Sequence, residues 1–182
     1  HPGQDTVIGA VLASGGPLVV DAGALDQCVR ARSAGSRASQ PHQVLLTPHE
    51  RELIGALAAI RHDVTLDDVL RDRTGHARLL AETARATVLL KGTRTIIAAP
   101  GGAVAELPEA PAWLATAGTG DVLAGIAGAL LAAGLSAPEA GAAASWVHAR
   151  AAEAASGGGP IAALDVADAV PAIIADLLLS TE

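Results

Sequence analysis

Short apolar runs alternate with helix-period patterns along the first half of the chain. The runs expected to form strands are 17–21, 43–46 and 87–91. The segments expected to form helices are 5–14, 25–32, 48–60 and 76–86. Strands that are apolar throughout and are separated by helices are typical of a parallel sheet with helices on both faces. The pattern therefore predicts an α/β fold.

The second half of the chain has a different pattern of expected elements. Residues 95–98 and 103–107, joined across Pro100-Gly101-Gly102, predict a late antiparallel hairpin. Two long Ala-rich helices are expected next, ending near 134 and spanning 138–155. We expect Asp165 to cap a last helical segment that Pro171 divides in two. No stretch is long enough to act as a linker, so residues 1–182 are expected to form one domain.

Several polar residues follow the expected strands directly. Asp21, Thr47 and Lys91 each stand at the carboxyl end of a strand. Ligands of parallel α/β sheets collect at these ends, so we expect one site to gather these residues with the turn 118–121. Thr47 is predicted to be the N-cap of the following helix, with Pro48 at its first position and Glu50 completing a capping box.

The turn at Ala117-Gly118-Thr119-Gly120-Asp121 carries the sharpest chemical signal. Small residues let the backbone approach a ligand, and the first N–H groups of the following helix form an anion site. A carboxylate in that first turn suits a base that takes a proton from an attacking hydroxyl, a role that Asp121 could fill. The alternative is a Gly-rich turn in which Asp121 only stabilises the helix start.

Two further residues are candidates for ligand binding. Lys91, followed by Gly92, could carry positive charge to phosphate oxygens, or it could be a solvated strand end. The spacing does not match a Walker loop. His49 could contact a substrate at the mouth of the sheet or be an ordinary surface histidine, and no second histidine follows at the spacing of a zinc site.

Composition excludes several classes of protein. A hydrophobic fraction of 51% excludes intrinsic disorder, and a net charge of −7 with two aromatic residues disfavours a nucleic-acid binder. The longest apolar stretch, about 14 residues from 122 to 135, is shorter than the roughly 20 needed to cross a bilayer. We therefore expect a soluble protein that does not bind membranes. Cys28 is the only cysteine, which excludes an intramolecular disulfide and suits the cytoplasm.

Four motifs in order resemble those of the NAD(P)H-hydrate dehydratase family, within the ribokinase-like superfamily, and His148 stands on the expected following helix. The motifs are Asp21-Ala22-Gly23-Ala24-Leu25, Thr47-Pro48-His49-Glu50-Arg51-Glu52, Lys91-Gly92-Thr93-Arg94-Thr95 and Thr116-Ala117-Gly118-Thr119-Gly120-Asp121. The chain departs from the family pattern at Gly23, Arg51 and Ala117, where the family usually has Asp, Gly and Gly. The resemblance covers essentially the whole chain and implies a ribokinase-like fold.

The resemblance also implies an activity. It implies a hydro-lyase that uses ADP or ATP, with Mg²⁺, to phosphorylate the ring hydroxyl of hydrated NADH or NADPH and then release phosphate. Asp121 would be the catalytic base, and His49 and Asp121 would contact the hydrated dinucleotide. The residues implied to bind the nucleotide are Lys91, Gly92, Thr93, Arg94, Thr95, Pro111, Ala112, Trp113, Leu114, Ala115, Thr116, Ala117, Gly118, Thr119 and Gly120. No metal-binding side chain is implied.

Further expectations concern the whole protein. The resemblance implies a cytoplasmic homotetramer, with an epimerase as a fused domain or partner, and a family domain that begins about a hundred residues earlier. We therefore expect these residues to lack the N-terminal third of the domain. Expressed alone, they would be poorly soluble, because Val19, Val20 and Leu45 would lie beside an open sheet edge. Two other functions stay open: a sugar or vitamin-precursor kinase of the same superfamily, and a non-catalytic nucleotide-binding module.

Overall fold

A five-stranded sheet forms the centre of the computed structural model, which describes residues 2–35 and 43–179. Its strands lie in sequence order: β1 (Leu18–Val20), β2 (Val44–Leu46), β3 (Thr87–Leu90), β4 (Arg94–Ala98) and β5 (Val104–Glu109). The first three strands are parallel, with Val19 opposite Leu45 and Leu46 opposite Val88. β4 and β5 continue the sheet as an antiparallel hairpin. The predicted α/β class and the late hairpin are confirmed.

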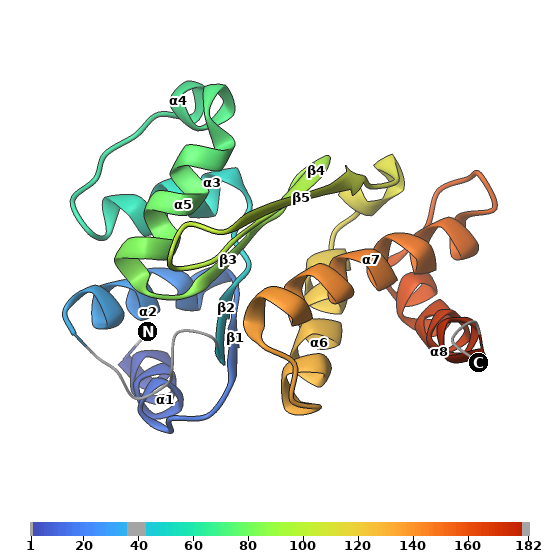
Figure 1. Cartoon of the computed structure of the whole chain (residues 1–182), viewed down its shortest axis with the longest axis horizontal. Helices are drawn as coiled ribbons and strands as arrows, with labels where there is room; N and C mark the ends of the chain where they lie inside the picture. The colour runs from blue at the N-terminus through green and yellow to red at the C-terminus, as the bar shows by residue number, and fades with distance from the viewer. Residues whose placement is uncertain (1, 36–42, 180–182) are drawn as a thin grey trace.

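Helices cover both faces of the sheet (Figure 1). On one face lie α2 (Leu25–Ser33), α3 (Glu50–Ala58), α4 (Leu66–Arg71) and α5 (Arg73–Ala84), and on the other lie α6 (Thr119–Ala132) and α7 (Ala137–Ser156). Successive side chains along a strand point to opposite faces of the sheet, so the core has two parts. Leu46 and Val88 pack with the first group, whereas Leu45 and Leu89 pack with the second.

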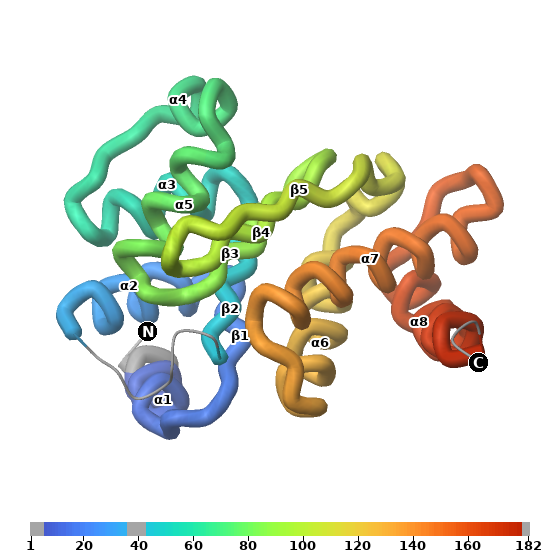
Figure 2. Tube along the Cα trace, in the orientation of Figure 1, coloured from blue at the N-terminus to red at the C-terminus, as the bar shows by residue number. Residues whose placement is uncertain are grey.

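The two ends of the described chain lie on opposite sides of the molecule. Figure 2 shows α1 (Pro2–Ala13) beside α2 and α8 (Ala163–Leu179) beside α7. β1 pairs only with β2 among the described strands, as expected for Val19 and Val20. Leu45 lies instead in β2, between β1 and β3, so its expected place beside an open edge is wrong.

The start of α3 differs from the sequence prediction. His49 is the N-cap, and it forms the capping box with Glu52: the Glu52 N–H donates to His49 Nδ1 over 3.2 Å, and the His49 N–H donates to Glu52 Oε2 over 2.8 Å. The predicted roles of Thr47, Pro48 and Glu50 are wrong. Thr47 continues the strand direction instead, because its N–H donates to the Val20 carbonyl over 3.0 Å.

Pro171 does not divide the last helix, so that prediction is wrong. α8 is continuous through Pro171. A proline removes only one helical hydrogen bond and crowds one carbonyl, and here both flanking parts of the helix pack on the same layer. Val166 before it is buried, and Ile173 after it packs against the same cluster of apolar residues. α8 begins at Ala163, so Asp165 lies in its first turn and is not the cap residue that the sequence predicts; its carboxylate accepts the Ala162 N–H just before the helix over 2.7 Å.

Two further boundaries in the first half of the chain differ from the prediction. α5 begins at Arg73, three residues before the expected 76, because the Asp72 side chain accepts the Gly75 N–H over 2.7 Å and starts the helix there. The expected loop 33–41 belongs to α2 at Ser33 and otherwise lies largely outside the described residues.

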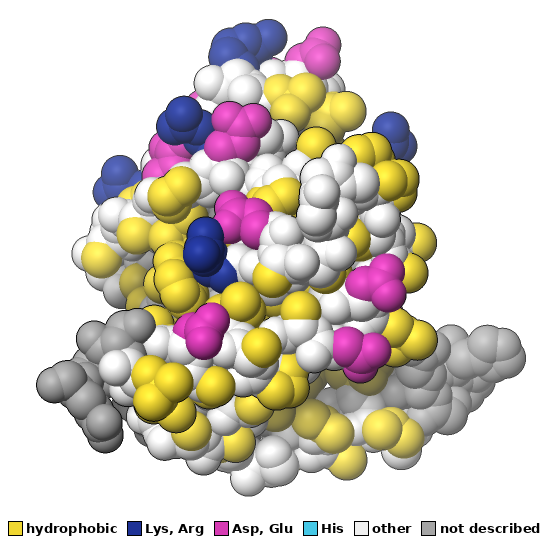
Figure 3. All heavy atoms as spheres, turned by 90° about the vertical axis from the view of Figure 1, so that its right-hand side faces the viewer, with side chains coloured by type: hydrophobic (Ala, Val, Ile, Leu, Met, Phe, Trp, Pro, Cys, Tyr) yellow, Lys and Arg dark blue, Asp and Glu magenta, His cyan; other side chains and the backbone are white. Residues whose placement is uncertain are grey.

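Apolar side chains remain exposed on α8. Figure 3 turns the side that carries α7 and α8 toward the viewer and shows hydrophobic side chains over the lower part of this face. Leu164, Leu178 and Leu179 are the most exposed apolar residues of α8.

Within the described ranges, no helix is both long and apolar enough to span a membrane.

Candidate functional site

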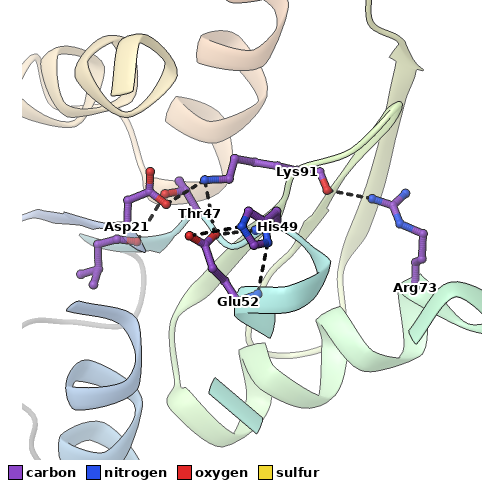
Figure 4. A network of polar contacts seen from close by, with 7 residues as sticks. Asp21, Thr47, His49, Glu52, Arg73 and Lys91 are labelled. Carbon is purple, nitrogen blue, oxygen red and sulfur yellow. Dashed lines mark hydrogen bonds and ion pairs between the residues drawn. The ribbon is translucent and has the colours of Figure 1, made fainter. Parts of the chain in front are cut away.

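The carboxyl ends of the three parallel strands meet at one point of the sheet, as the sequence predicts. Asp21 follows β1, Thr47 follows β2 and Lys91 follows β3. Lys91 Nζ lies 2.8 Å from Asp21 Oδ1 (Figure 4). The Lys91 N–H donates to the Pro48 carbonyl over 2.8 Å. Residues that are 70 positions apart in the sequence are thereby joined in one polar network.

The Lys91 ammonium is a partly buried cation shared by two carboxylates. Its side chain is 20% exposed, and Nζ lies 3.6 Å from Glu52 Oε2 in addition to its contact with Asp21. A Cβ added at Gly120 would lie 3.6 Å from Nζ. The ammonium therefore lies against the first turn of α6, and Lys91 is not a solvated strand end.

The Gly-rich turn is held by two features of its own residues. Gly118 has φ +87°, which favours glycine because other residues rarely adopt the left-handed region. Thr119 is buried, and its hydroxyl lies 2.7 Å from the Leu114 carbonyl and 2.8 Å from the Thr116 carbonyl. The turn thus presents the positive end of α6 beside the Lys91 ammonium, an arrangement that suits an anion.

A cavity of about 530 Å³ adjoins this turn, a size typical of small-ligand sites. It brings together most of the residues that the sequence singles out. Those that line it are His49, Lys91, Gly92, Thr93, Thr95, Pro111, Ala112, Leu114, Ala115, Thr116, Thr119 and Gly120.

Five of the predicted residues do not line this cavity: Arg94, Trp113, Ala117, Gly118 and Asp121. Arg94 extends along the hairpin instead, where its guanidinium lies 3.3 Å from Glu106. Trp113 is 41% exposed. Asp121 is exposed in the first turn of α6, outside the cavity lining but next in sequence to Gly120, which lines it.

The cavity also includes residues that sequence reasoning missed: Glu50, Glu109, Ala110, Leu123, Ser145 and His148. Ser145 and His148 are three positions apart on α7 and therefore share one helix face. Polar residues on an otherwise Ala-rich face were the signal that could have identified them.

His148 lies in the floor of the cavity as a neutral group. Burial lowers the pKa of its imidazole to about 4, and a hydrogen bond with the Thr119 backbone only partly opposes this effect. His148 Nε2 and Ser145 Oγ are both buried and have no hydrogen-bond partner within the described structure. Such groups are stabilised by a bound ligand or water, because an unpaired buried polar atom is costly.

Arg73 of α5 fixes the loop that follows β3. Its guanidinium donates to the Lys91 carbonyl over 3.0 Å and to the Arg94 carbonyl over 2.8 Å, and it pairs with Glu50 at 3.1 Å. These bonds hold residues 91–94 in one conformation along the cavity wall. No local pattern in the sequence indicates this role, because the partners of Arg73 come from different elements.

His49 caps α3 and also exposes part of its ring to the cavity. Its Nδ1 accepts the Glu52 N–H, so a neutral ring carries its proton on Nε2. The His49 side chain is 48% exposed and lines the cavity. The ring can therefore donate a hydrogen bond to a ligand while it caps α3.

Replacing Gly92 by Ala is expected to lower the free energy of unfolding by about 1 to 3 kcal/mol. A Cβ at Gly92 would overlap the Arg73 guanidinium and lie 2.9 Å from Glu50 Oε1. Arg73 would have to move and would lose its bonds to the loop. Urea denaturation measures the change.

Gly125→Ala is the control for this substitution. Nothing lies within 4 Å of the added Cβ, and Gly125 is in the middle of α6, where Ala favours the helix. The control is expected to leave stability unchanged or raised. Equal stability of Gly92→Ala and the unsubstituted protein would contradict the account of the Arg73 contacts.

No metal centre is formed by the side chains in the two described ranges. No group of three or more His, Cys, Asp or Glu residues there is arranged to hold a metal ion. Any Mg²⁺ at this site would have to be held mainly by the oxygens of a bound nucleotide and by water, which is how Mg²⁺ is commonly bound with phosphates.

Comparison with known proteins agrees with the motif series. A family model described as NAD(P)H-hydrate dehydratase matches residues 1–171. The chain is 46% identical over 136 residues to the bifunctional NAD(P)H-hydrate repair enzyme Nnr of Mycobacterium leprae, a match covering 75% of this chain and 27% of that protein. It is 38% identical over 137 residues to the ADP-dependent (S)-NAD(P)H-hydrate dehydratase of Neisseria meningitidis serogroup B, a match covering 75% of this chain and 45% of that protein.

The fold has a counterpart among solved structures. The ADP/ATP-dependent NAD(P)H-hydrate dehydratase from Bacillus subtilis, co-crystallized with ATP/Mg²⁺, superposes with a TM-score of 0.82 at 26% identity. The match covers 97% of this chain and 60% of that one. The chain therefore spans only part of each of these proteins.

Proposed function

This chain belongs to the NAD(P)H-hydrate dehydratase family, and we propose that the protein containing it restores hydrated NADH and NADPH to NADH and NADPH, with ADP or ATP as cosubstrate. The reaction is that of a hydro-lyase coupled to nucleotide cleavage. The relatives named above act in NAD(P)H-hydrate repair, and the Neisseria protein is ADP-dependent.

One observation carries this proposal: the Lys91 ammonium lies against the Gly120 turn at the edge of a cavity of nucleotide size. A cation and a helix N-terminus on the same side of a cavity suit the transfer of a phosphoryl group. Most residues of the loop 91–95 and of the segment 111–120 line the same cavity, and they would hold the nucleotide.

In the proposed reaction, Asp121 takes the proton from the ring hydroxyl of the hydrate while the hydroxyl oxygen attacks the terminal phosphorus of ADP. The bond to AMP breaks, and AMP leaves. The carbon–oxygen bond of the phosphorylated ring then breaks, phosphate leaves with that oxygen, and loss of a proton from the adjacent carbon restores the double bond. Phosphate is a far better leaving group than hydroxide, which is the reason for the transfer.

The roles of the chain's own residues follow from their positions. Lys91 would neutralise charge on the transferred phosphoryl group, and the backbone of Thr119 and Gly120 would hold its oxygens. His49 Nε2 would donate to the hydrated dinucleotide. Mg²⁺ would enter with the nucleotide and shield its phosphates.

Turnover of hydrated NADH with ADP distinguishes the three candidate functions. The proposed enzyme is expected to restore the absorbance of the dihydronicotinamide ring and to release AMP and inorganic phosphate. A superfamily kinase for another small molecule would not regenerate NADH, and if it accepted the hydrate it would leave a stable phosphorylated product. A non-catalytic binding module would bind ADP without consuming it. Absence of NADH formation by the intact protein would contradict the proposal.

Three properties of the whole protein belong to the same proposal. We place the protein in the cytoplasm as a homotetramer, and we expect an epimerase for the two hydrate epimers as a fused domain or separate partner. The bifunctional relatives support a second activity in the same chain. Light scattering on the purified protein measures its mass in solution, and a monomer would contradict the tetramer.

A further inference from the structure

A second cavity adjoins the nucleotide cavity at the start of α3. It has a volume of about 460 Å³ and is lined by His49, Glu50, Arg51, Leu66 and Leu70. His49 and Glu50 line both cavities, so the two meet at the N-cap of α3. His49 thus stands between the cavity that adjoins Lys91 and Gly120 and a second one that extends toward α4.

Arg51 gives the second cavity an uncompensated positive charge. The two neighbouring carboxylates are already engaged, because Glu50 pairs with Arg73 at 3.1 Å and Glu52 accepts the His49 N–H while lying 3.6 Å from Lys91. No carboxylate within 2–35 or 43–179 forms an ion pair with Arg51, whose side chain is exposed. The guanidinium is therefore available to an anionic ligand.

The part of the lining that comes from α4 is apolar. It consists of Leu66 and Leu70, and Leu70 is 54% exposed. A large exposed apolar side chain in a concave site favours a flat, apolar group such as a nucleobase. One free guanidinium and an apolar wall in the same cavity thus match a base that carries a nearby phosphate.

Under the proposed function, the first cavity receives ADP and the hydrated dinucleotide needs space in addition. The cavity's volume of about 530 Å³ is that of a site for one small ligand, and under the proposed function it holds ADP. His49 lines both cavities, so a dinucleotide whose reacting ring lies at the Gly120 turn would extend past His49 into the second cavity.

We propose that the cavity lined by Arg51, Leu66 and Leu70 binds the adenosine end of the hydrated dinucleotide, and that Arg51 contacts the 2′-phosphate present in NADPH and absent from NADH. This inference rests on the proposed function. The 2′-phosphate lies on the ribose that bears adenine, so a base against Leu66 and Leu70 places it beside the wall that carries Arg51. A guanidinium binds a phosphomonoester through two parallel hydrogen bonds, which makes Arg51 a specificity-determining residue.

The test compares kcat/KM for hydrated NADPH and hydrated NADH in three variants. The unsubstituted protein is expected to prefer hydrated NADPH by about 10-fold, the scale of one charged hydrogen bond at an exposed site. Arg51→Ala is expected to abolish this preference by lowering only the value for hydrated NADPH, and Arg51→Lys to retain part of it. The preference is also expected to decrease at high salt.

Arg71→Ala is the matched control. Arg71 is an exposed arginine of α4 that pairs with Asp68 at 3.1 Å and does not line the cavity, so its removal is expected to leave the preference unchanged. A structural effect of Arg51 would lower both values equally and would leave their ratio unchanged.

Two results would overturn the inference without affecting the proposed function. One is that Arg51→Ala leaves kcat/KM unchanged for both hydrates. The other is an equal loss for both hydrates, which would assign Arg51 to the shared pyrophosphate or to folding. Lack of turnover of either hydrate by the unsubstituted protein would instead overturn the proposed function.

Discussion

Asp121→Asn is expected to lower turnover of hydrated NADPH by a factor on the order of 10² to 10⁴, the usual contribution of a general base. The amide preserves the size of the side chain and cannot accept the hydroxyl proton. Asp121 is exposed in the first turn of α6, so its replacement removes no buried contact. Affinity for ADP is expected to remain close to that of the unsubstituted protein, because the cavity lining does not include Asp121.

Rate and affinity are measured separately to test this role. Single-turnover kinetics with saturating ADP give the rate of phosphoryl transfer, and calorimetry gives the ADP dissociation constant. Asp165→Asn is a control for loss of one exposed helix-start carboxylate, because Asp165 lies at the start of α8, outside the cavity. Near-normal turnover of Asp121→Asn would remove Asp121 from the mechanism and favour its role as a helix-stabilising charge.

Lys91→Ala is expected to weaken ADP binding by about 1.5 to 3 kcal/mol, the scale of a charge-assisted hydrogen bond. Two effects act in the same direction. The variant loses the cation beside the Gly120 turn, and it leaves the Asp21 and Glu52 carboxylates without their partner next to the nucleotide phosphates. Calorimetry with ADP measures the change.

A double substitution separates these two effects. In Asp21→Asn combined with Lys91→Ala, the repulsion by Asp21 is absent, so ADP affinity is expected to recover part of the loss seen in Lys91→Ala alone. Asp21→Asn alone removes one of the two carboxylates that contact Lys91 and keeps the ammonium. Unchanged ADP affinity in Lys91→Ala would show that the ammonium serves only the ion pairs of the folded chain.

The parts of the fold that sequence predicts well are those fixed by local pattern. Apolar runs at 43–46 and 87–91 become buried strands because both faces of a covered sheet exclude water. The position of Lys91 at the end of β3 follows from that boundary. Its contact with Asp21 then follows from parallel pairing, which brings the carboxyl ends of the strands together.

Helix starts were harder to predict where two residues compete for the same role. Thr47 and His49 are both followed by an acidic residue three positions later, Glu50 and Glu52. The backbone of Thr47 is committed to Val20 of the neighbouring strand, which leaves His49 to cap the helix. That choice depends on sheet pairing, and a local pattern does not contain it.

The residues of the candidate site also fall into two groups: those in contiguous motifs and those that tertiary packing brings to the site. Loop 91–95 and segment 111–120 could be identified because each is a contiguous motif. Ser145 and His148 show only as polar residues on an Ala-rich helix face, and Arg73 has no local signal, because these residues reach the cavity or its loop from separate helices through tertiary packing. Trp113 and Arg94 lie within the identified motifs but do not line the cavity. The Trp113 side chain is exposed, and the Arg94 side chain pairs with Glu106.

The fate of the hydroxyl oxygen tests the central claim most directly. Hydrated NADPH labelled with oxygen-18 at the ring hydroxyl is incubated with the protein and ADP, and mass spectrometry follows the label. If the hydroxyl is phosphorylated before it leaves, the label is expected in inorganic phosphate, in an amount equal to the NADPH and AMP formed. Label found in water, or NADPH formed without AMP, would contradict the account.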